Sequence, residues 1–264
     1  MDIFTILFYQ PIYNLLIVFY RLFSNNLGIA IICIAIITKL ISFPLTKKQY
    51  QLAEDSKRIN DEIKFIRDKY KNDKERMQQE ILALQSKYLP TQLSGCLPLI
   101  IQFVFLINIY HVVNDIVTIG TESFNKVAYP FVQKFGQDEI LYSNFFGVDL
   151  KLSPSIAVTN SDINIPFYLL FVVLIGITQF LSMNVFFKKK KHTLSVNNSN
   201  DKKTDASANL EEVMENTQRQ LLIMFPILVT FISYSLPTGL SLYWIVQSVF
   251  AIIQQFVFLK NNKK

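Results

Sequence analysis

Four long apolar blocks separated by charged runs constrain this sequence more than any other feature. A helix that crosses a bilayer needs about 20 mostly apolar residues, and blocks of that kind lie at 27–44, 95–113, 165–187 and 221–259. The last block is too long for one span, and Leu236-Pro237-Thr238-Gly239 interrupts it. Because proline and glycine end one helix and permit a tight turn, we expect two spans there. The pattern predicts an all-α integral membrane protein, a bundle of five transmembrane helices.

The segment at 3–23 precedes the first span and has a mixed character. It is apolar enough to cross a membrane, yet it carries the polar residues Gln10, Asn14 and Arg21 together with Pro11. Its many Tyr and Phe residues suit the interfacial layer of a bilayer, where aromatic side chains gather. The composition favours a helix that lies in the membrane surface, with a further span as the alternative.

The Lys and Arg residues lie almost entirely on one side of the predicted membrane. Of the 26 in the chain, 21 lie at 47–92, 188–220 and 260–264, whereas four are Arg21 and the three basic residues of 114–164. Cytosolic loops carry the excess of basic residues. Both basic loops and the C-terminus are therefore predicted to be cytosolic, with the N-terminus outside.

The stretch at 192–210 has almost no large apolar residue, so it cannot bury a core and is predicted to be disordered. The Lys run at 188–191 would anchor the preceding span at the anionic leaflet, and contact with nucleic acid, without sequence specificity, is the weaker alternative. In full, the sequence predicts an N-terminal interfacial helix at 1–26 and five spans at 27–46, 95–113, 165–187, 220–236 and 239–259. A cytosolic helical hairpin is predicted at 47–94, and an extracytosolic loop with a short interfacial helix at 114–164. A largely disordered cytosolic loop is predicted at 188–219, and a basic tail at 260–264.

The hairpin is predicted from two apolar stripes on either side of a polar turn at 71–74. Each stripe has the spacing 4, 3, 4, which places its residues on one face of a helix. Two such helices joined by a short turn pack as an antiparallel pair, although two separate helices on the lipid surface remain possible. The stripes are Ile59, Ile63, Ile66 and Tyr70, and Met77, Ile81, Leu84 and Tyr88.

Lys39 is a cation inside the first predicted span, directly after Thr38. A charge at the bilayer centre costs about 2.5–3.5 kcal/mol on insertion scales, and such residues usually face a bundle interior or a water-filled cavity. A lysine near the cytosolic edge can instead reach the headgroups with its long stem. The position of Lys39 alone leaves a groove and a surface-reaching side chain equally open.

Polar residues recur in the other spans and make a shared wet interior plausible, although any one of them can simply bond a neighbouring helix. Cys33 and Cys96 lie in apolar blocks and are expected to be small buried hydrophobes. The chain has no phosphate loop, zinc-spaced cluster or serine elbow, so we expect no enzyme activity, metal or cofactor. The recurring polar residues are Gln102, Asn108, Gln179, Ser182, Asn184, Thr230, Ser233, Tyr234, Ser235, Gln247, Ser248, Gln254 and Gln255.

Three stretches together resemble the YidC/Oxa/Alb family of membrane-protein insertases. They are the run from Lys39 to Tyr50, Gly95-Cys96-Leu97-Pro98, and Pro237-Thr238-Gly239 followed by Tyr243-Trp244. The resemblance covers roughly 10–260. It implies five core helices around a hydrophilic groove that opens to the cytosol and lipid and is closed to the outside. The implied groove residues are Lys39, Thr38, Gln102, Gln179, Tyr243, Trp244 and Gln247, with Pro237 and Gly239 as the structural turn.

The sequence departs from the family pattern at the groove. The family usually has arginine where Lys39 stands, often threonine where Ala35 stands, and often asparagine where Ser248 stands. The tail at 260–264 is short for a ribosome-binding tail. The groove is therefore expected to be less polar than is usual for the family, or to use Gln247 instead.

The resemblance implies an insertase and chaperone of the bacterial inner membrane. Its partners would be nascent membrane proteins and the lipid bilayer, with the ribosome and a Sec-type translocon as further candidates. Two other readings are a small transporter or channel, for which no inverted repeat is evident, and a membrane scaffold that docks a partner through the hairpin.

Overall fold

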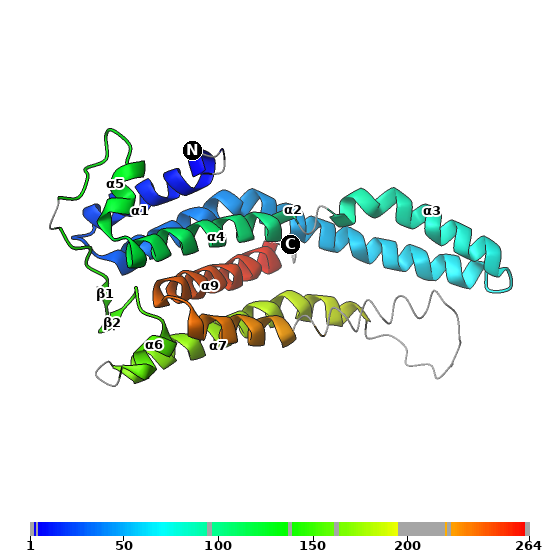
Figure 1. The fold of residues 1–264 in the computed structure, drawn as a ribbon. Helices are drawn as coiled ribbons and strands as arrows, with labels where there is room; N and C mark the ends of the chain where they lie inside the picture. The colour runs from blue at the N-terminus through cyan, green and yellow to red at the C-terminus, as the bar shows by residue number, and fades with distance from the viewer. Residues whose placement is uncertain are drawn as a thin grey trace.

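The computed structural model describes residues 3, 5–93, 97–136, 139–160, 164–194, 220 and 223–261, and this part of the chain is almost wholly helical (Figure 1). The elements are the π-helix η1 (Thr5–Tyr9), α1 (Gln10–Leu22), α2 (Leu27–Lys69), α3 (Lys74–Leu93), α4 (Leu97–Thr118), α5 (Thr121–Val127), β1 (Asn144–Phe145), β2 (Val148–Asp149), α6 (Pro154–Thr159), α7 (Ile165–Leu194), an unlabelled helix at 223–235 and α9 (Thr238–Asn261).

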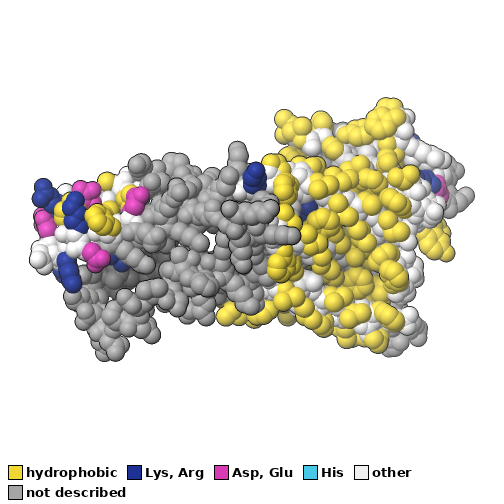
Figure 2. Space-filling model, turned by 180° about the vertical axis from the view of Figure 1, so that it is seen from behind, with side chains coloured by type: hydrophobic (Ala, Val, Ile, Leu, Met, Phe, Trp, Pro, Cys, Tyr) yellow, Lys and Arg dark blue, Asp and Glu magenta, His cyan; other side chains and the backbone are white. Residues whose placement is uncertain are grey.

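Three helices in the described part of the chain are long and apolar enough to cross a membrane, over Leu27–Pro44, Ile165–Met183 and Thr238–Val257. Two shorter apolar helices cover Phe103–Ile116 and Ile223–Ser235. Hydrophobic side chains cover the face of the bundle seen in Figure 2, whereas charged side chains gather at the far tip of α2 and α3. Water-soluble proteins rarely expose so continuous an apolar surface. The chain is therefore an all-α membrane protein.

Helix α2 runs without interruption from the bundle to the tip of its partner α3 (Figure 1). The sequence predicted a span over 27–46 and a separate hairpin helix, but α2 passes straight through Pro44. Ser42 Oγ donates to Thr38 O at 2.7 Å and Thr46 Oγ1 donates to Ser42 O at 2.9 Å. Neither hydroxyl reaches Leu40 O, the carbonyl that loses its backbone donor at Pro44.

The apolar stripes of α2 and α3 pack against each other beyond the bundle. Ile63, Met77 and Ile81 are buried between the two helices, and Ile66, Tyr70 and Leu84 pack around them. The turn ends where Asp73 Oδ1 accepts a bond from Arg76 N at 3.1 Å, which caps the start of α3. The side chains of Ile59 and Tyr88, predicted for the same stripes, lie outside the described residues, as do 195–219 of the predicted disordered loop.

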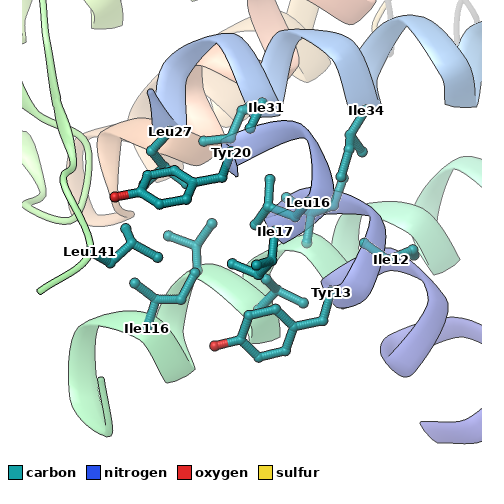
Figure 3. Close-up of a cluster of buried hydrophobic side chains, with 14 of the residues drawn as sticks. Ile12, Tyr13, Leu16, Ile17, Tyr20, Leu27, Ile31, Ile34, Ile116 and Leu141 are labelled. Carbon is teal, nitrogen blue, oxygen red and sulfur yellow. The ribbon is translucent and has the colours of Figure 1, made fainter. Parts of the chain in front are cut away.

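The main apolar core lies where α1 packs against α2, α4 and α5 (Figure 3). Helix α1 turns one face inward, and Tyr13, Ile17 and Tyr20 are almost completely buried there. Residues on its other face, among them Val18 and Leu22, are exposed. This one-sided burial is typical of an amphipathic helix.

Residues 121–160 form a layer across one end of the bundle, which we call the loop layer. It holds α5, α6 and the β1–β2 pair, where the sequence predicted one short helix. Asn14 of α1, only 2% exposed, ties it down: Nδ2 donates to Val127 O at 2.9 Å, and Oδ1 accepts from Tyr129 N at 2.7 Å. Arg21 pairs with Glu139 through both guanidinium nitrogens.

The loop layer also supplies the cap of α9. Thr238 N donates to Leu152 O at 2.9 Å and Gly239 N donates to Leu150 O at 2.8 Å, which satisfies two of the free donors at the start of that helix. A Cβ on Gly239 would lie 3.2 Å from Leu150 O, so glycine permits this close approach. Hydrogen bonds to the loop layer thus hold the turn that was predicted at Pro237 and Gly239.

Candidate functional site

A cavity of about 450 Å³ lies inside the bundle, between α2, α4, α7, the 223–235 helix and α9. Apolar side chains from α4 and the 223–235 helix form most of one side, and α7 and α9 supply the polar groups of the other. Its lining residues are Lys39, Phe103, Leu106, Ile107, Tyr110, Gln179, Ser182, Met183, Phe225, Leu228, Val229, Ile232, Leu236, Leu240, Trp244, Gln247, Ser248 and Ala251.

Among the described residues that line this cavity, Lys39 carries the one charged side chain. It is half-buried and lies about 18 Å along α2 from Leu27, at 1.5 Å per residue. The apolar window of α2 ends at Pro44, so the Cα of Lys39 lies within it, about 8 Å from that end at the same rise. A cation at that depth needs water or an anionic group beside it, and the cavity has room for either.

Thr38 and Gln247 join α2 to α9 directly beside Lys39. Gln247 Nε2 donates to Thr38 Oγ1 at 2.6 Å and to Ala35 O at 3.0 Å. Thr38 Oγ1 donates in turn to carbonyls of its own helix, at Ile34 and Ala35. Both side chains are almost fully buried, so they fix the distance between the two helices at the level of Lys39.

A second set of polar contacts joins α9 to α7. Ser248 Oγ donates to Gln179 Oε1 at 2.6 Å, and Gln255 Nε2 donates to Ser182 O at 3.2 Å. Helix α9 is therefore bonded to α2 on one side and to α7 on the other. Both Ser248 and Gln179 line the cavity, so this contact also forms part of its polar wall.

Gln247 keeps one polar atom free in the cavity wall. Its Oε1 is buried and has no hydrogen-bond partner among the described residues, while its Nε2 is committed to Thr38 and Ala35. A buried amide oxygen without a partner is costly. The cavity thus presents an ammonium donor on α2 and an amide acceptor on α9 within otherwise apolar walls.

The polar residues lie away from the loop layer. Leu236 and Leu240 line the cavity at the start of α9, next to the residues that the layer caps. Gln247 lies about 14 Å from Thr238 along α9, and Gln179 lies about 21 Å from Ile165 along α7, at 1.5 Å per residue. The cavity lining is therefore apolar near the start of α9 and polar further along the helix.

The structure brings together most of the side chains that the sequence and its resemblance predicted for a groove. Lys39, Gln179, Trp244 and Gln247 line the cavity, and Thr38 bonds Gln247. Tyr243 instead points into the main core, where it is fully buried. The side chain of Gln102 lies outside the described residues.

Sequence reasoning did not select Tyr110 or the leucines of the cavity wall. Ser182 was named only as one of many polar residues in the spans, although it follows Gln179 by three residues, a spacing that puts both on one helix face. The wall leucines give no such signal, because apolar residues surround every span.

A larger hollow of about 730 Å³ lies between α7 and the 223–235 helix. Its lining is apolar apart from Thr230 and Tyr234 and includes no charged residue. It shares no lining residue with the Lys39 cavity. The smaller cavity, which has a charged residue and several polar residues in its lining, is therefore the candidate functional site.

A family model described as 60Kd inner membrane protein matches residues 18–264. The chain is 28% identical to the membrane protein insertase YidC of Syntrophobacter fumaroxidans over 251 residues, 94% of this chain and 37% of the relative. It is 28% identical to that of Wigglesworthia glossinidia brevipalpis over 255 residues, 97% of this chain and 37% of the relative. It is also 28% identical to that of Rickettsia prowazekii over 254 residues, 96% of this chain and 39% of the relative.

The chain thus spans less than two fifths of the length of these relatives. The matched region, in contrast, takes in nearly the whole chain, from α1 through α9. It includes every helix that lines the Lys39 cavity as well as the loop layer that caps α9. The chain belongs to the 60Kd inner membrane protein family.

Proposed function

We propose that this chain is a membrane protein insertase, and that its substrates enter the bilayer through the cavity around Lys39. The observation that carries the proposal is a cavity among five helices that holds a single described cation deep within the apolar part of the bundle. The name of the relatives, membrane protein insertase YidC, points to the same activity.

The physical task of an insertase is to lower the cost of taking a polar flank across an apolar layer. Moving unpaired polar groups out of water costs several kcal/mol each. In our proposal, Lys39 and the free oxygen of Gln247 receive the polar flank of the substrate half-way across. The substrate's apolar segment then leaves sideways into lipid, where burial of its surface, about 25 cal/mol per Å², drives the step. No nucleotide is needed.

We further propose five spans in the bacterial inner membrane, with the N-terminus outside and the C-terminus in the cytosol. The two shorter apolar helices at 103–116 and 223–235 would complete the five, and α1 would lie in the outer surface. The loop layer would then close the outer end of the cavity. The α2–α3 pair would extend into the cytosol as a hairpin that receives nascent membrane proteins, with the ribosome or a Sec-type translocon as possible donors.

The proposal is tested by insertion of a single-span substrate into vesicles that contain the purified chain. One substrate carries an acidic tail that must cross the membrane, and the other carries an uncharged tail. A charge-assisted hydrogen bond is worth about 1.5–3 kcal/mol. Lys39→Ala should therefore lower insertion of the acidic tail roughly tenfold or more, and Lys39→Arg should retain it.

Lys47→Ala is the matched control, because Lys47 is an exposed lysine on the same helix beyond the apolar window. It should insert both substrates as the unmodified chain does. Equal insertion of the acidic tail by Lys39→Ala and Lys47→Ala would contradict the groove role. Flux of small solutes without any protein substrate would favour a channel instead.

A further inference from the structure

The tip of the β1–β2 hairpin carries an aromatic side chain in a backbone conformation that such residues rarely adopt. The turn residues Phe146 and Gly147 have φ values of 50° and 82°. Two positive φ values fit the tight hairpin turns that usually hold Asn or Gly, and a bulky residue there is uncommon. Phe146 is nevertheless 80% exposed, so packing within the chain gives no reason for it.

The hairpin is fixed at the ends of two membrane-spanning helices. The ring of Phe145 lies on Gly28, close enough that a Cβ at Gly28 would be 2.2 Å from it. A Cβ on Gly147 would lie 3.7 Å from Nδ2 of Asn164. The apolar windows of α2 and α7 begin at Leu27 and Ile165, one residue from these two contacts. The turn therefore lies at the level where the hydrocarbon layer begins.

The turn of the hairpin carries two adjacent aromatic side chains and no charged residue of its own. The ring of Phe146 meets that of Phe145 edge-on, with centroids 4.6 Å apart. The nearby carboxylate of Asp149 is held inside the hairpin, where Oδ1 accepts bonds from Ser143 Oγ at 2.6 Å and Lys151 N at 3.0 Å. Phe167, in the first turn of α7, is 47% exposed. The exposed apolar face of α7 thus begins at the level of the tip.

We propose that the hairpin tip inserts Phe146 into the interfacial layer of the leaflet on the loop-layer side. The ring of Phe146 has no polar group, so it gains by leaving water for the apolar side of this layer, where Phe and Leu side chains of interfacial segments lie. The occupant of the Phe146 surface is lipid, since the tip stands at the membrane boundary and carries no charge. Through Leu150 and Leu152, the same segment caps α9, so the anchor sets the depth of the start of α9. This contact holds whether or not the cavity handles protein substrates.

The test uses a full-length chain with one tryptophan as the reporter. The natural chain has a single Trp, which Trp244→Phe removes, and Phe146→Trp then introduces the probe. Lys134→Trp is the matched control, because Lys134 is an exposed, charged residue of the same layer. Both chains are placed in phosphatidylcholine vesicles with or without bromine on the upper acyl carbons. Emission is measured with and without iodide in the water.

The proposal predicts that brominated lipid removes most of the emission at 146 and leaves that at 134, whereas iodide does the reverse. Iodide quenching at 146 equal to that at 134 would overturn it. So would bromine quenching that disappears as protein is added at fixed lipid, because a second copy would then cover Phe146.

A nitroxide attached at Phe146→Cys gives an independent measurement should the tryptophan variant fail to fold. Cys33 and Cys96 are first replaced by alanine so that the label is unique. Faster relaxation by lipid-soluble oxygen than by an aqueous nickel chelate supports the anchor, and the opposite ranking contradicts it. Neither measurement depends on insertion activity, so failure of the anchor and failure of the insertase are distinguishable.

Discussion

The loop end of the bundle and the region around Lys39 differ in how well they are filled. Both contain bonds between distant segments, since Asn14 bonds Val127 O at the loop end and Gln247 bonds Ala35 O beside Lys39. Apolar side chains fill the loop end, whereas a cavity of about 450 Å³ lies beside Lys39. One region is filled, and the other is hollow.

This difference suits a groove that is closed on one side. Close-packed regions resist deformation, so the loop layer can hold the ends of α2 and α9 in place. A region that contains a cavity is less rigidly packed than a filled one, and interhelical polar contacts in membranes average only about 0.6 kcal/mol. The account therefore predicts that substitutions at the loop end change stability, whereas substitutions around Lys39 change insertion.

The largest effect on stability is expected from Asn14→Ala. The substitution leaves Tyr129 N without its partner and removes one of the two bonds to Val127 O, to which Gln10 Nε2 still donates. An unsatisfied buried group costs about 1–3 kcal/mol, and a lost hydrogen bond costs about 1 kcal/mol more. We expect a loss of roughly 2–4 kcal/mol in reversible unfolding in mixed detergent. The exposed Asn160→Ala is the control and should change stability by less than about 0.5 kcal/mol. Equal effects would remove the contrast between the two regions.

Gly28→Ala should come next, because its new methyl would overlap the ring of Phe145. Overpacking of this kind costs about 1–3 kcal/mol, and the hairpin must shift to accommodate it. Gly136→Ala serves as the comparison, since its nearest neighbour would lie at an ordinary 3.9 Å. A thermal unfolding midpoint that falls for Gly28→Ala and stays constant for Gly136→Ala is the expected result. No difference would mean that Phe145 is not held as described.

Gln247→Leu tests the other half of the comparison. It removes the bonds to Thr38 and Ala35 and the free Oε1. Stability should fall by less than about 1 kcal/mol, whereas insertion of an acidic tail should drop several-fold. Thr178→Val is the control, because Thr178 bonds only carbonyls of its own helix in the described contacts. A large loss of stability with normal insertion would instead show that Gln247 stabilises the fold and does not act in insertion.

The smallest effect concerns the pH dependence of the loop layer. The hydrogen bond from Arg21 lowers the pKa of the Glu139 carboxyl below its ordinary 4.5. The ion pair between Arg21 and Glu139 therefore contributes its full stabilisation of the folded state above pH 4.5. This stabilisation is lost as pH falls through the lowered pKa of Glu139. Because the pair is partly exposed, the change should stay below about 1 kcal/mol. Unfolding measured between pH 3 and 7 should lose this component in Glu139→Gln, and an unchanged profile would contradict the pairing.

The apolar helices and the turn at Pro237 could be predicted because length and composition alone determine them. Blocks predicted at 27–44, 165–187 and 239–259 overlap the three helices that can cross a membrane. Lys39 could be singled out because a charge inside an apolar block is costly. These signals are local and need no knowledge of neighbouring elements.

The rest depends on which face of each helix meets which neighbour. Tyr243 and Trp244 are adjacent, yet one is in the core and the other lines the cavity. The cap that Leu150 gives α9 likewise depends on a contact between distant segments. Hydropathy reports how apolar a segment is, but it does not report the direction of a side chain.

The most direct test of the central claim is photo-crosslinking of an arrested nascent chain whose tail has not yet crossed. A photoreactive phenylalanine is placed either at Trp244, which lines the cavity, or at Val249 of the same helix, which is exposed and lines neither hollow. The account predicts a strong adduct with the tail at 244 and little at 249. Equal adducts, or an adduct at 249 alone, would show that the substrate does not pass through the Lys39 cavity.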